Sequence, residues 1–355
     1  MKESDIASII GQELDSNITT ILQNRLSLLS EWRILVKDNF EHLNYVLDKL
    51  DERLITSDHW LFITYDELDR LLTTYNALAN PIRELLAFWL DRSRRWERIR
   101  PKIFLRTDLF REEFLGFPDA SKLQSHRLEW RPSWLYQLWI KRLANSAQEM
   151  RDYLQIIPNL IYESSTQLGW NVRSDEQLFQ ELIEIMIGKY MGASPKKGIT
   201  YRWIPNHLQD TGGRIAPRSF LKLFDKAAAK RLEHFESFEQ LTELYLLQPS
   251  DLQSALMDTS EDRIKELAQE EYSWLESLKT NLEGLEAPIL KETFLEAVRS
   301  TKWEKLPPVT EPEGIMQYLI QLGVVESRLD GRINIPEIYL YGFKVKRRGG
   351  VKRPQ

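Results

Sequence analysis

The 355-residue sequence contains no cysteine. Disulfide bonds and metal sites built from thiolates are therefore excluded. Histidine is also scarce, and its five positions are scattered without the i, i+4 spacing of a helical zinc pair. We therefore expect no structural zinc.

Long hydrophobic runs are absent as well, since no apolar stretch approaches the roughly 18–20 residues needed to span a bilayer. The first ten residues, MKESDIASII, lack the basic-then-apolar layout of a secretion signal. The formal net charge of −5 gives the chain as a whole no non-specific attraction to nucleic acid. We expect a cytoplasmic protein that does not enter a membrane.

The sequence also lacks a G-x-x-x-x-G-K-[ST] phosphate loop. The nearest cluster is GASPKKG at 192–198, which contains Pro195 and follows a predicted helix. A phosphate cradle needs backbone N–H groups that converge at a helix N-terminus directly after a strand. We therefore expect these residues alone to bind ATP poorly or not at all.

What the sequence does contain is a short aromatic and aliphatic run, residues 60–65, that ends abruptly in acidic residues. The composition predicts a buried strand. Asp66 and Glu67 follow it directly, where open α/β sheets place ligands. Such a pair can hold Mg²⁺ through water and orient or deprotonate an attacking water. The alternative is structural, with Asp66 capping a helix that begins at Leu68.

A second predicted strand, residues 102–106, also ends in polar residues, Thr107 and Asp108. About thirty residues of predicted helix separate it from the first strand, which suits two adjacent parallel strands joined by a crossover. We therefore expect both polar ends at one edge of a sheet. The alternative is a surface ion pair between Arg106 and Asp108, which would contribute little.

A third candidate is Arg218, in the first turn of a helix predicted to begin at Pro217, after a loop at Gly212 and Gly213. The helix dipole disfavours a cation there, so we expect the arginine to have a specific contact. His207 and Asp210 precede this loop, and we favour packing roles for them over ligand contacts.

The remaining pattern predicts a mostly α protein with a partial α/β part at its start. Residues 3–54, 68–78, a stretch with Pro81 in its first turn, and 132–154 are expected to be helical, and HRLEW near 126–130 a third strand. From about 155 to 305 the periodicity is almost entirely helical. KLPPVTEP at 305–312 is a predicted linker.

The last fifty residues predict a helix, a strand at 324–328, an Asp-Gly turn and a return strand at 333–335. This is the outline of a winged helix. We therefore predict three parts: a partial α/β part at 1–155, a helical region at 156–305 and a winged-helix-like part with a basic tail at 306–355.

Two segments are strongly basic although the chain as a whole has a negative net charge. One is DRSRRWERIRPK at 91–102, and the other is the tail with Lys344, Lys346, Arg347, Arg348, Lys352 and Arg353. Each is either solvated surface or a contact for phosphates or an acidic partner.

Taken together, four segments resemble the later part of bacterial AAA+/STAND-like P-loop ATPases: FITYDELDRL, KIFLRTDLFREEFLGFPDASKL, YRWIPNHLQDTGGRIAPRSFL and YLYGFKVKRRGG. The resemblance runs from about residue 55 to the end, and it implies that 1–155 is a partial P-loop ATPase-like core and 156–305 a helical lid region. It implies that Asp66 and Glu67 are a Walker B pair, with Asp66 binding Mg²⁺ through water. It further implies that Thr107 or Asp108 is a sensor and Arg218 a lid residue that reaches the nucleotide.

The missing phosphate loop leaves two interpretations of this resemblance. In the first, the chain acts in a regulatory or anti-phage ATPase with a partner that supplies Walker A, and Mg-ATP binds only in the complete site. In the second, the chain is a non-enzymatic winged-helix module that binds DNA or protein. A hydrolase or transferase using Asp66, Glu67 and His207 has no support from spacing. A homo-oligomer is compatible with all of these.

Overall fold

The computed structural model describes residues 34, 36–68, 75–105, 110, 128–163, 169–233, 245–270 and 272–348. The chain divides into two compact units, Met1–Arg127 and Leu128–Gln355. Helices predominate in both, as expected, and the sheets are small. Among the described residues, no helix has the length and apolar character to cross a membrane. The domain boundaries at 155 and 305 stay predictions.

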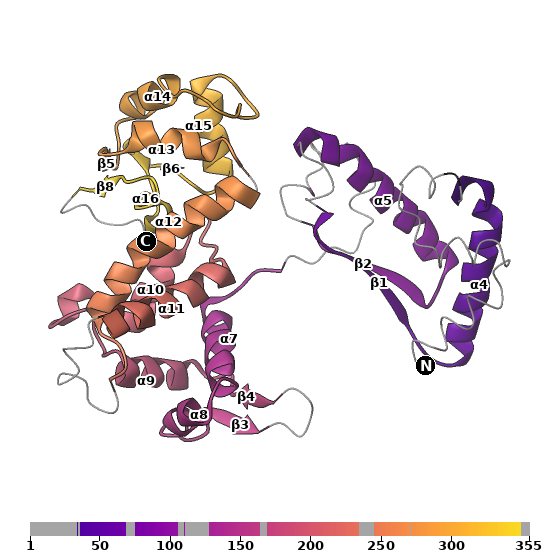
Figure 1. Ribbon diagram of the computed structural model, residues 1–355, viewed down its shortest axis with the longest axis horizontal. Coiled ribbons are helices and arrows are strands. Elements are labelled where there is room, and N and C mark those ends of the chain that lie inside the picture. Colours follow the sequence, from indigo (N-terminus) through magenta and orange to yellow (C-terminus); the bar gives the residue numbers. More distant parts are fainter. Residues whose placement is uncertain are drawn as a thin grey trace. The chain divides into compact units, whose positions relative to one another are not determined.

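The first unit contains a parallel two-stranded sheet with two helices against it (Figure 1). Its elements within the described residues are α4 (Phe40–Thr56), β1 (Leu61–Tyr65), α5 (Tyr75–Arg95) and β2 (Ile99–Ile103). The register aligns Leu61 with Ile99 and Tyr65 with Ile103, so both strands end together. The predicted parallel pairing, with a helical connection between the strands, is confirmed.

One face of this sheet packs into a hydrophobic core with the described helices of the unit. Leu61, Ile63 and Ile99 pack with Leu50 of α4 and Trp89 of α5. Alternate strand residues point away from this core, and the burial of β1 alternates accordingly. The prediction that residues 60–65 form a strand is therefore confirmed, whereas the prediction that the strand is buried is wrong for its second face.

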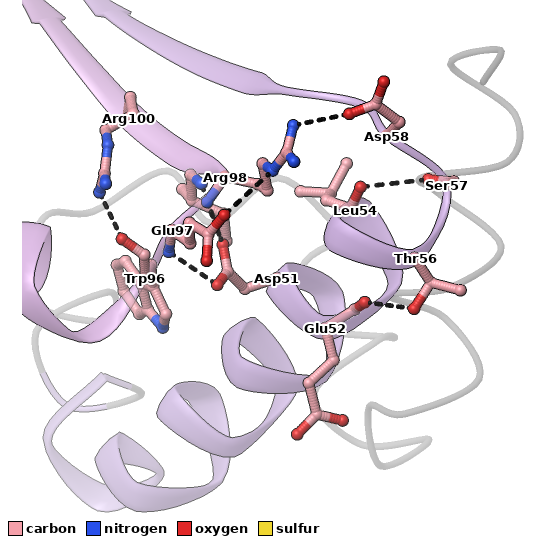
Figure 2. Close-up of polar contacts among 11 residues, drawn as sticks. Asp51, Glu52, Leu54, Thr56, Ser57, Asp58, Trp96, Glu97, Arg98 and Arg100 are labelled. Carbon is pink, nitrogen blue, oxygen red and sulfur yellow. Dashed lines mark hydrogen bonds and ion pairs between the residues drawn. The ribbon is translucent and has the colours of Figure 1, made fainter.

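Two aspartates of α4 fix the start of β2. The carboxylate of Asp51 accepts hydrogen bonds from the backbone N–H groups of Glu97, Arg98 and Ile99, between 2.7 and 3.0 Å (Figure 2). Three N–H donors on one buried carboxylate satisfy backbone groups that no strand partner reaches. Asp48, one turn earlier, pairs with Arg95 and accepts from Trp96 Nε1 at 2.9 Å. Side chains of α4 thus hold the segment that connects α5 to β2.

Three local predictions in this unit need correction. The second strand spans Ile99–Ile103 rather than 102–106, because Asp51 orders the backbone from residue 97 onward. Pro81 lies inside α5 instead of in the first turn of a separate helix. Of the predicted third strand, residues 128–130 are not a strand, and 126–127 lie outside the described residues.

The second unit is largely helical, with three small two-stranded sheets in its described part. Its helices are α7 (Pro132–Ala144), α8 (Gln148–Leu154), α9 (Glu176–Met186), the short 3-10 helix η3 (Pro195–Lys197), α10 (Thr200–Leu208), α11 (Pro217–Glu233), α12 (Pro249–Glu270), α13 (Leu275–Leu282), α14 (Lys291–Arg299), α15 (Pro312–Gln321) and α16 (Glu337–Leu340). Its strands are β3 (Ile161–Glu163), β4 (Trp170–Val172), β5 (Glu286–Ala287), β6 (Glu326–Ser327), β7 (Ile333–Asn334) and β8 (Lys346–Arg347).

Aromatic stacking joins the helices of this unit around one hydrophobic core. The ring of Tyr136 on α7 lies 4.3 Å from that of Tyr201 on α10, and Trp139 lies 3.9 Å from Phe224 on α11. The Tyr136 hydroxyl donates to the Tyr201 carbonyl at 2.7 Å, and burial raises the pKa of that hydroxyl well above its ordinary value. The buried tyrosine is therefore neutral and hydrogen-bonded, as a closed core requires.

Sequence periodicity missed part of this unit. The predicted helix at 132–154 is broken into α7 and α8 by a turn at residues 145–147. The antiparallel pair β3–β4 and the strand β5 lie within the region expected to be almost entirely helical. Strands of two or three residues are too short to show a period-2 pattern.

The C-terminal helix and hairpin are as predicted in order. α15 is followed by β6 and β7, which pair antiparallel across an Asp330–Gly331 turn. Gly331 has φ of 78°, a conformation that glycine adopts without steric cost. The strands are shorter than the predicted 324–328 and 333–335. The winged-helix assignment itself stays a prediction.

Candidate functional site

The candidate site lies at the carboxyl end of the β1–β2 sheet. Because Tyr65 pairs with Ile103, the residues that follow the two strands leave the sheet at one edge. The Phe104 N–H donates to the Tyr65 carbonyl at 2.9 Å and extends the pairing by one residue. Asp66 and Glu67 stand at this edge, and both are exposed. Thr107 and Asp108 lie outside the described residues.

The backbone turns sharply at the acidic pair. Glu67 has φ of 54°, in the left-handed region, which costs a non-glycine residue roughly 1–2 kcal/mol. The Glu67 N–H donates to the Asp66 carboxylate at 2.8 Å. Asp66 therefore stabilises the turn of the next residue. The alternative, in which Asp66 caps a helix that begins at Leu68, stays a prediction. Residues 69–74 lie outside the described part of the chain.

Exposed carboxylates on adjacent residues at a strand end can bind a hydrated divalent cation and orient a water molecule. Within the described residues there is no group of three or more histidine, aspartate or glutamate side chains that could hold a metal by itself. Asp66 and Glu67 would therefore hold Mg²⁺ only together with other ligands, such as nucleotide phosphates.

The glycine-lysine segment GASPKKG forms a tight turn. Its centre is the single-turn helix η3, and Tyr190 and Ile199 on either side of the segment form an antiparallel bridge. A strand does not lead into it, and no long helix begins in it. The backbone N–H of Gly198 donates to the Pro195 carbonyl within the turn.

Arg218 is the second residue of α11, in the first turn as predicted. Its guanidinium lies 3.8 Å from the carboxylate of Glu266 on α12. Lys222, one turn further along α11, reaches the same carboxylate at 2.7 Å. Arg218 thus forms an ion pair between two helices, in which the arginine is exposed and Glu266 is half-buried.

The loop before α11 is held by Asp210. Its carboxylate accepts from the backbone N–H groups of Gly212 and Arg214 and from Arg214 Nε, at 2.8–2.9 Å. His207 is buried, and its ring stacks on Trp203 at 3.9 Å. Both residues therefore have structural contacts within their unit, and the preference for packing over ligand contacts stays a prediction.

Sequence reasoning did not find the partner of His207. Its Nε2 lies 3.1 Å from the carboxylate of Glu337 on α16, and its Nδ1 lies 2.6 Å from the Trp203 carbonyl. The pair lines a surface groove of about 490 Å³ between α10, α12 and α16. No sequence signal connects two residues 130 positions apart, so only the fold could show this contact.

The basic tail is partly engaged inside its own unit. Lys344 pairs with Glu283 at 2.9 Å, and Arg347 donates to the Asn334 side chain and the Ile335 carbonyl at 2.6 and 2.8 Å. Lys346 is exposed, and the Arg348 N–H donates to the Ala287 carbonyl. Lys352 and Arg353 lie outside the described residues. Lys344 and Arg347 thus have structural contacts in addition to any phosphate contact.

Comparison with protein families, curated proteins and solved structures found no match for this chain. The interpretation of the site therefore depends on its own residues and on the resemblance carried by its short motifs.

Proposed function

We propose that the chain supplies the Walker B, sensor and lid elements of an AAA+/STAND-like P-loop ATPase, whose phosphate loop lies outside these 355 residues. The observation that carries this proposal is the parallel register of β1 and β2, which places the Asp66–Glu67 pair at the carboxyl edge of a sheet. Asp66 would bind Mg²⁺ through water, and Glu67 would orient or deprotonate the attacking water.

The strained turn at Glu67 supports this assignment. A glutamate in the left-handed region is retained at a cost, and such residues concentrate at functional sites. Both carboxylates are exposed at the sheet edge, where a nucleotide can approach. Without a phosphate cradle the nucleotide would lose most of its ligands, so we expect activity only when a phosphate loop from outside these 355 residues completes the site.

The test is ATP turnover by the tagged chain purified under native conditions with its partners. Glu67→Gln keeps the size of the side chain and removes the base, so we expect turnover to fall at least about 100-fold, as for loss of a general base. Glu52→Gln on α4, an exposed glutamate of the same unit, is the matched control and should leave turnover unchanged. Equal turnover in the wild type and Glu67→Gln would refute the assignment.

A second candidate is the non-enzymatic winged-helix module, favoured by the observed succession of α15, β6 and β7. It predicts retention of duplex DNA at low salt that weakens when residues 344–355 are removed. The internal contacts of Lys344 and Arg347 argue against their full availability for phosphates.

A further inference from the structure

The second face of the β1–β2 sheet carries aromatic and cationic side chains side by side. We call it the outer face and define it by Trp60, Phe62, Phe104, Arg98, Arg100 and Lys102. The three rings are 50%, 49% and 48% exposed, although they lie on or beside strands. The Trp60 and Phe62 rings are nearly parallel, with an interplanar angle of 7° and centroids 6.1 Å apart.

Two of the three cations of the outer face lie over these rings. Arg98 lies over Trp60 at 4.8 Å and Lys102 over Phe62 at 4.9 Å. Arg100 is opposite Phe62 in the strand register, and its guanidinium donates to the Trp96 and Ser93 carbonyls. These carbonyls hold the group without neutralising its charge. Cations two residues apart on a strand repeat every ~6.6 Å.

An exposed face is unusual for a parallel sheet, because crossover helices normally cover both sides. In the part of the sheet that the structure describes, three half-exposed rings therefore indicate a surface that another group covers. A packed protein helix fits poorly here, since it would bury Lys102, and lysine is depleted from protein interfaces. Among the described residues, no carboxylate forms an ion pair with Lys102 or Arg100 that could offset this burial.

Single-stranded nucleic acid meets both requirements of the outer face. Bases stack on exposed aromatic rings whatever their sequence, and phosphates neutralise lysine and arginine. Duplex DNA fits less well because its bases are stacked inside the helix. Asp58 and Glu97 pair with Arg98 at 3.0 and 3.6 Å and offset its charge, so the positive potential of the outer face is moderate (Figure 2). Because the phosphate contacts are exposed, binding should be sensitive to salt.

We propose that the outer face of the β1–β2 sheet binds single-stranded nucleic acid, with bases on Trp60 and Phe62 and phosphates on Lys102 and Arg100. The proposal does not depend on ATP hydrolysis or on the tail at 344–355. It gives a role to the basic segment at 91–102, which the ATPase assignment leaves unused.

The experiment is a fluorescence anisotropy titration of the full chain. The probe is a fluorescein-labelled oligothymidylate of about 20 nucleotides, longer than a typical single-strand site. At about 50 mM salt we expect saturable binding in the micromolar range, and weaker binding of the matched duplex. Trp60→Ser and Phe62→Ser should each weaken binding at least about fivefold through lost stacking.

Matched variants in the second unit serve as controls. Trp134 is 45% exposed and has Arg131 over its ring at 5.0 Å, so Trp134→Ser removes a similar exposed pair and should not change affinity. Lys102→Gln should reduce the slope of log affinity against log salt by about 0.7, the value for one phosphate contact. Lys196→Gln, at another exposed lysine, should leave the slope unchanged. Far-UV circular dichroism verifies that each variant is folded.

Three results would overturn the proposal: no binding of the oligothymidylate by the wild type at about 50 mM salt, equal losses in Trp134→Ser and Trp60→Ser, or an unchanged salt slope in Lys102→Gln. The outer face would instead be a protein interface if the wild-type chain self-associates and Trp60→Ser makes it monomeric without changing its affinity for the oligothymidylate.

Discussion

The large aromatic side chains compared between the two units differ in their exposure to solvent. In the second unit Tyr136, Phe220 and Phe294 are fully buried in one core, whereas in the first Trp60 and Phe62 remain half exposed on the outer face. Both sets belong to segments whose composition predicts burial. Composition thus indicates which residues favour burial. Only the fold shows whether the described part of the chain buries them.

The sharpest way to probe this comparison is to truncate one phenylalanine in each unit. Phe220→Ala creates a cavity in a closed core and should lower the free energy of unfolding by roughly 3–5 kcal/mol. Phe62→Ala removes a half-exposed ring and should cost less than about 1 kcal/mol. Urea unfolding followed by circular dichroism measures both. A cost at Phe62 equal to that at Phe220 would mean that the outer face is covered within the isolated chain.

A second prediction concerns Asp51, which holds the start of β2 in the first unit. Asp51→Ala removes the acceptor of three backbone N–H groups and should destabilise the first unit by roughly 3 kcal/mol. Glu52→Ala, at the exposed neighbouring position, should cost less than about 0.5 kcal/mol. Hydrogen exchange at the start of β2 reports the loss locally. Unchanged protection in Asp51→Ala would show that the strand pairing alone orders this segment.

The smallest expected effect is a pH dependence at Asp48. The hydrogen bond from Arg95 lowers the pKa of the Asp48 carboxyl below its ordinary value. A carboxyl with a lowered folded pKa stabilises the fold above its unfolded pKa of about 3.9, and this stability is lost as the pH falls through the folded value. Because both groups are partly exposed, the effect should be below about 1 kcal/mol.

Comparison of the wild type with Asp48→Asn tests this sign. The destabilisation caused by Asp48→Asn should be present at pH 6 and shrink as the pH falls below about 4. Urea midpoints at several pH values measure it. A difference that stays constant down to pH 2 would contradict an ionised Asp48 as its source.

The sequence was sufficient for elements with a strong local signal. The aromatic run at 60–65, the proline at 217 that begins α11 and the Asp330–Gly331 turn each predicted an observed feature. The parallel pairing followed from the helical connection between two strands, since parallel strands need a crossover.

Other features depend on contacts distant in the sequence. The start of β2 is set by Asp51, almost fifty residues earlier, so the strand could not be placed from its own composition. Glu337 meets His207 only through the packing of α16 on α10. The left-handed turn at Glu67 has no residue signature, because glycine or asparagine would normally mark it.

ATP binding measured before and after addition of the phosphate-loop polypeptide tests the central claim most directly. We expect no saturable Mg-ATP binding by the isolated chain up to about 1 mM, because these residues lack a phosphate cradle. Binding should develop in the complex, and Mg²⁺ dependence should weaken in Asp66→Asn. Two results would contradict the account: micromolar Mg-ATP binding by the isolated chain, or an unchanged Mg²⁺ dependence of ATP binding when the complex carries Asp66→Asn.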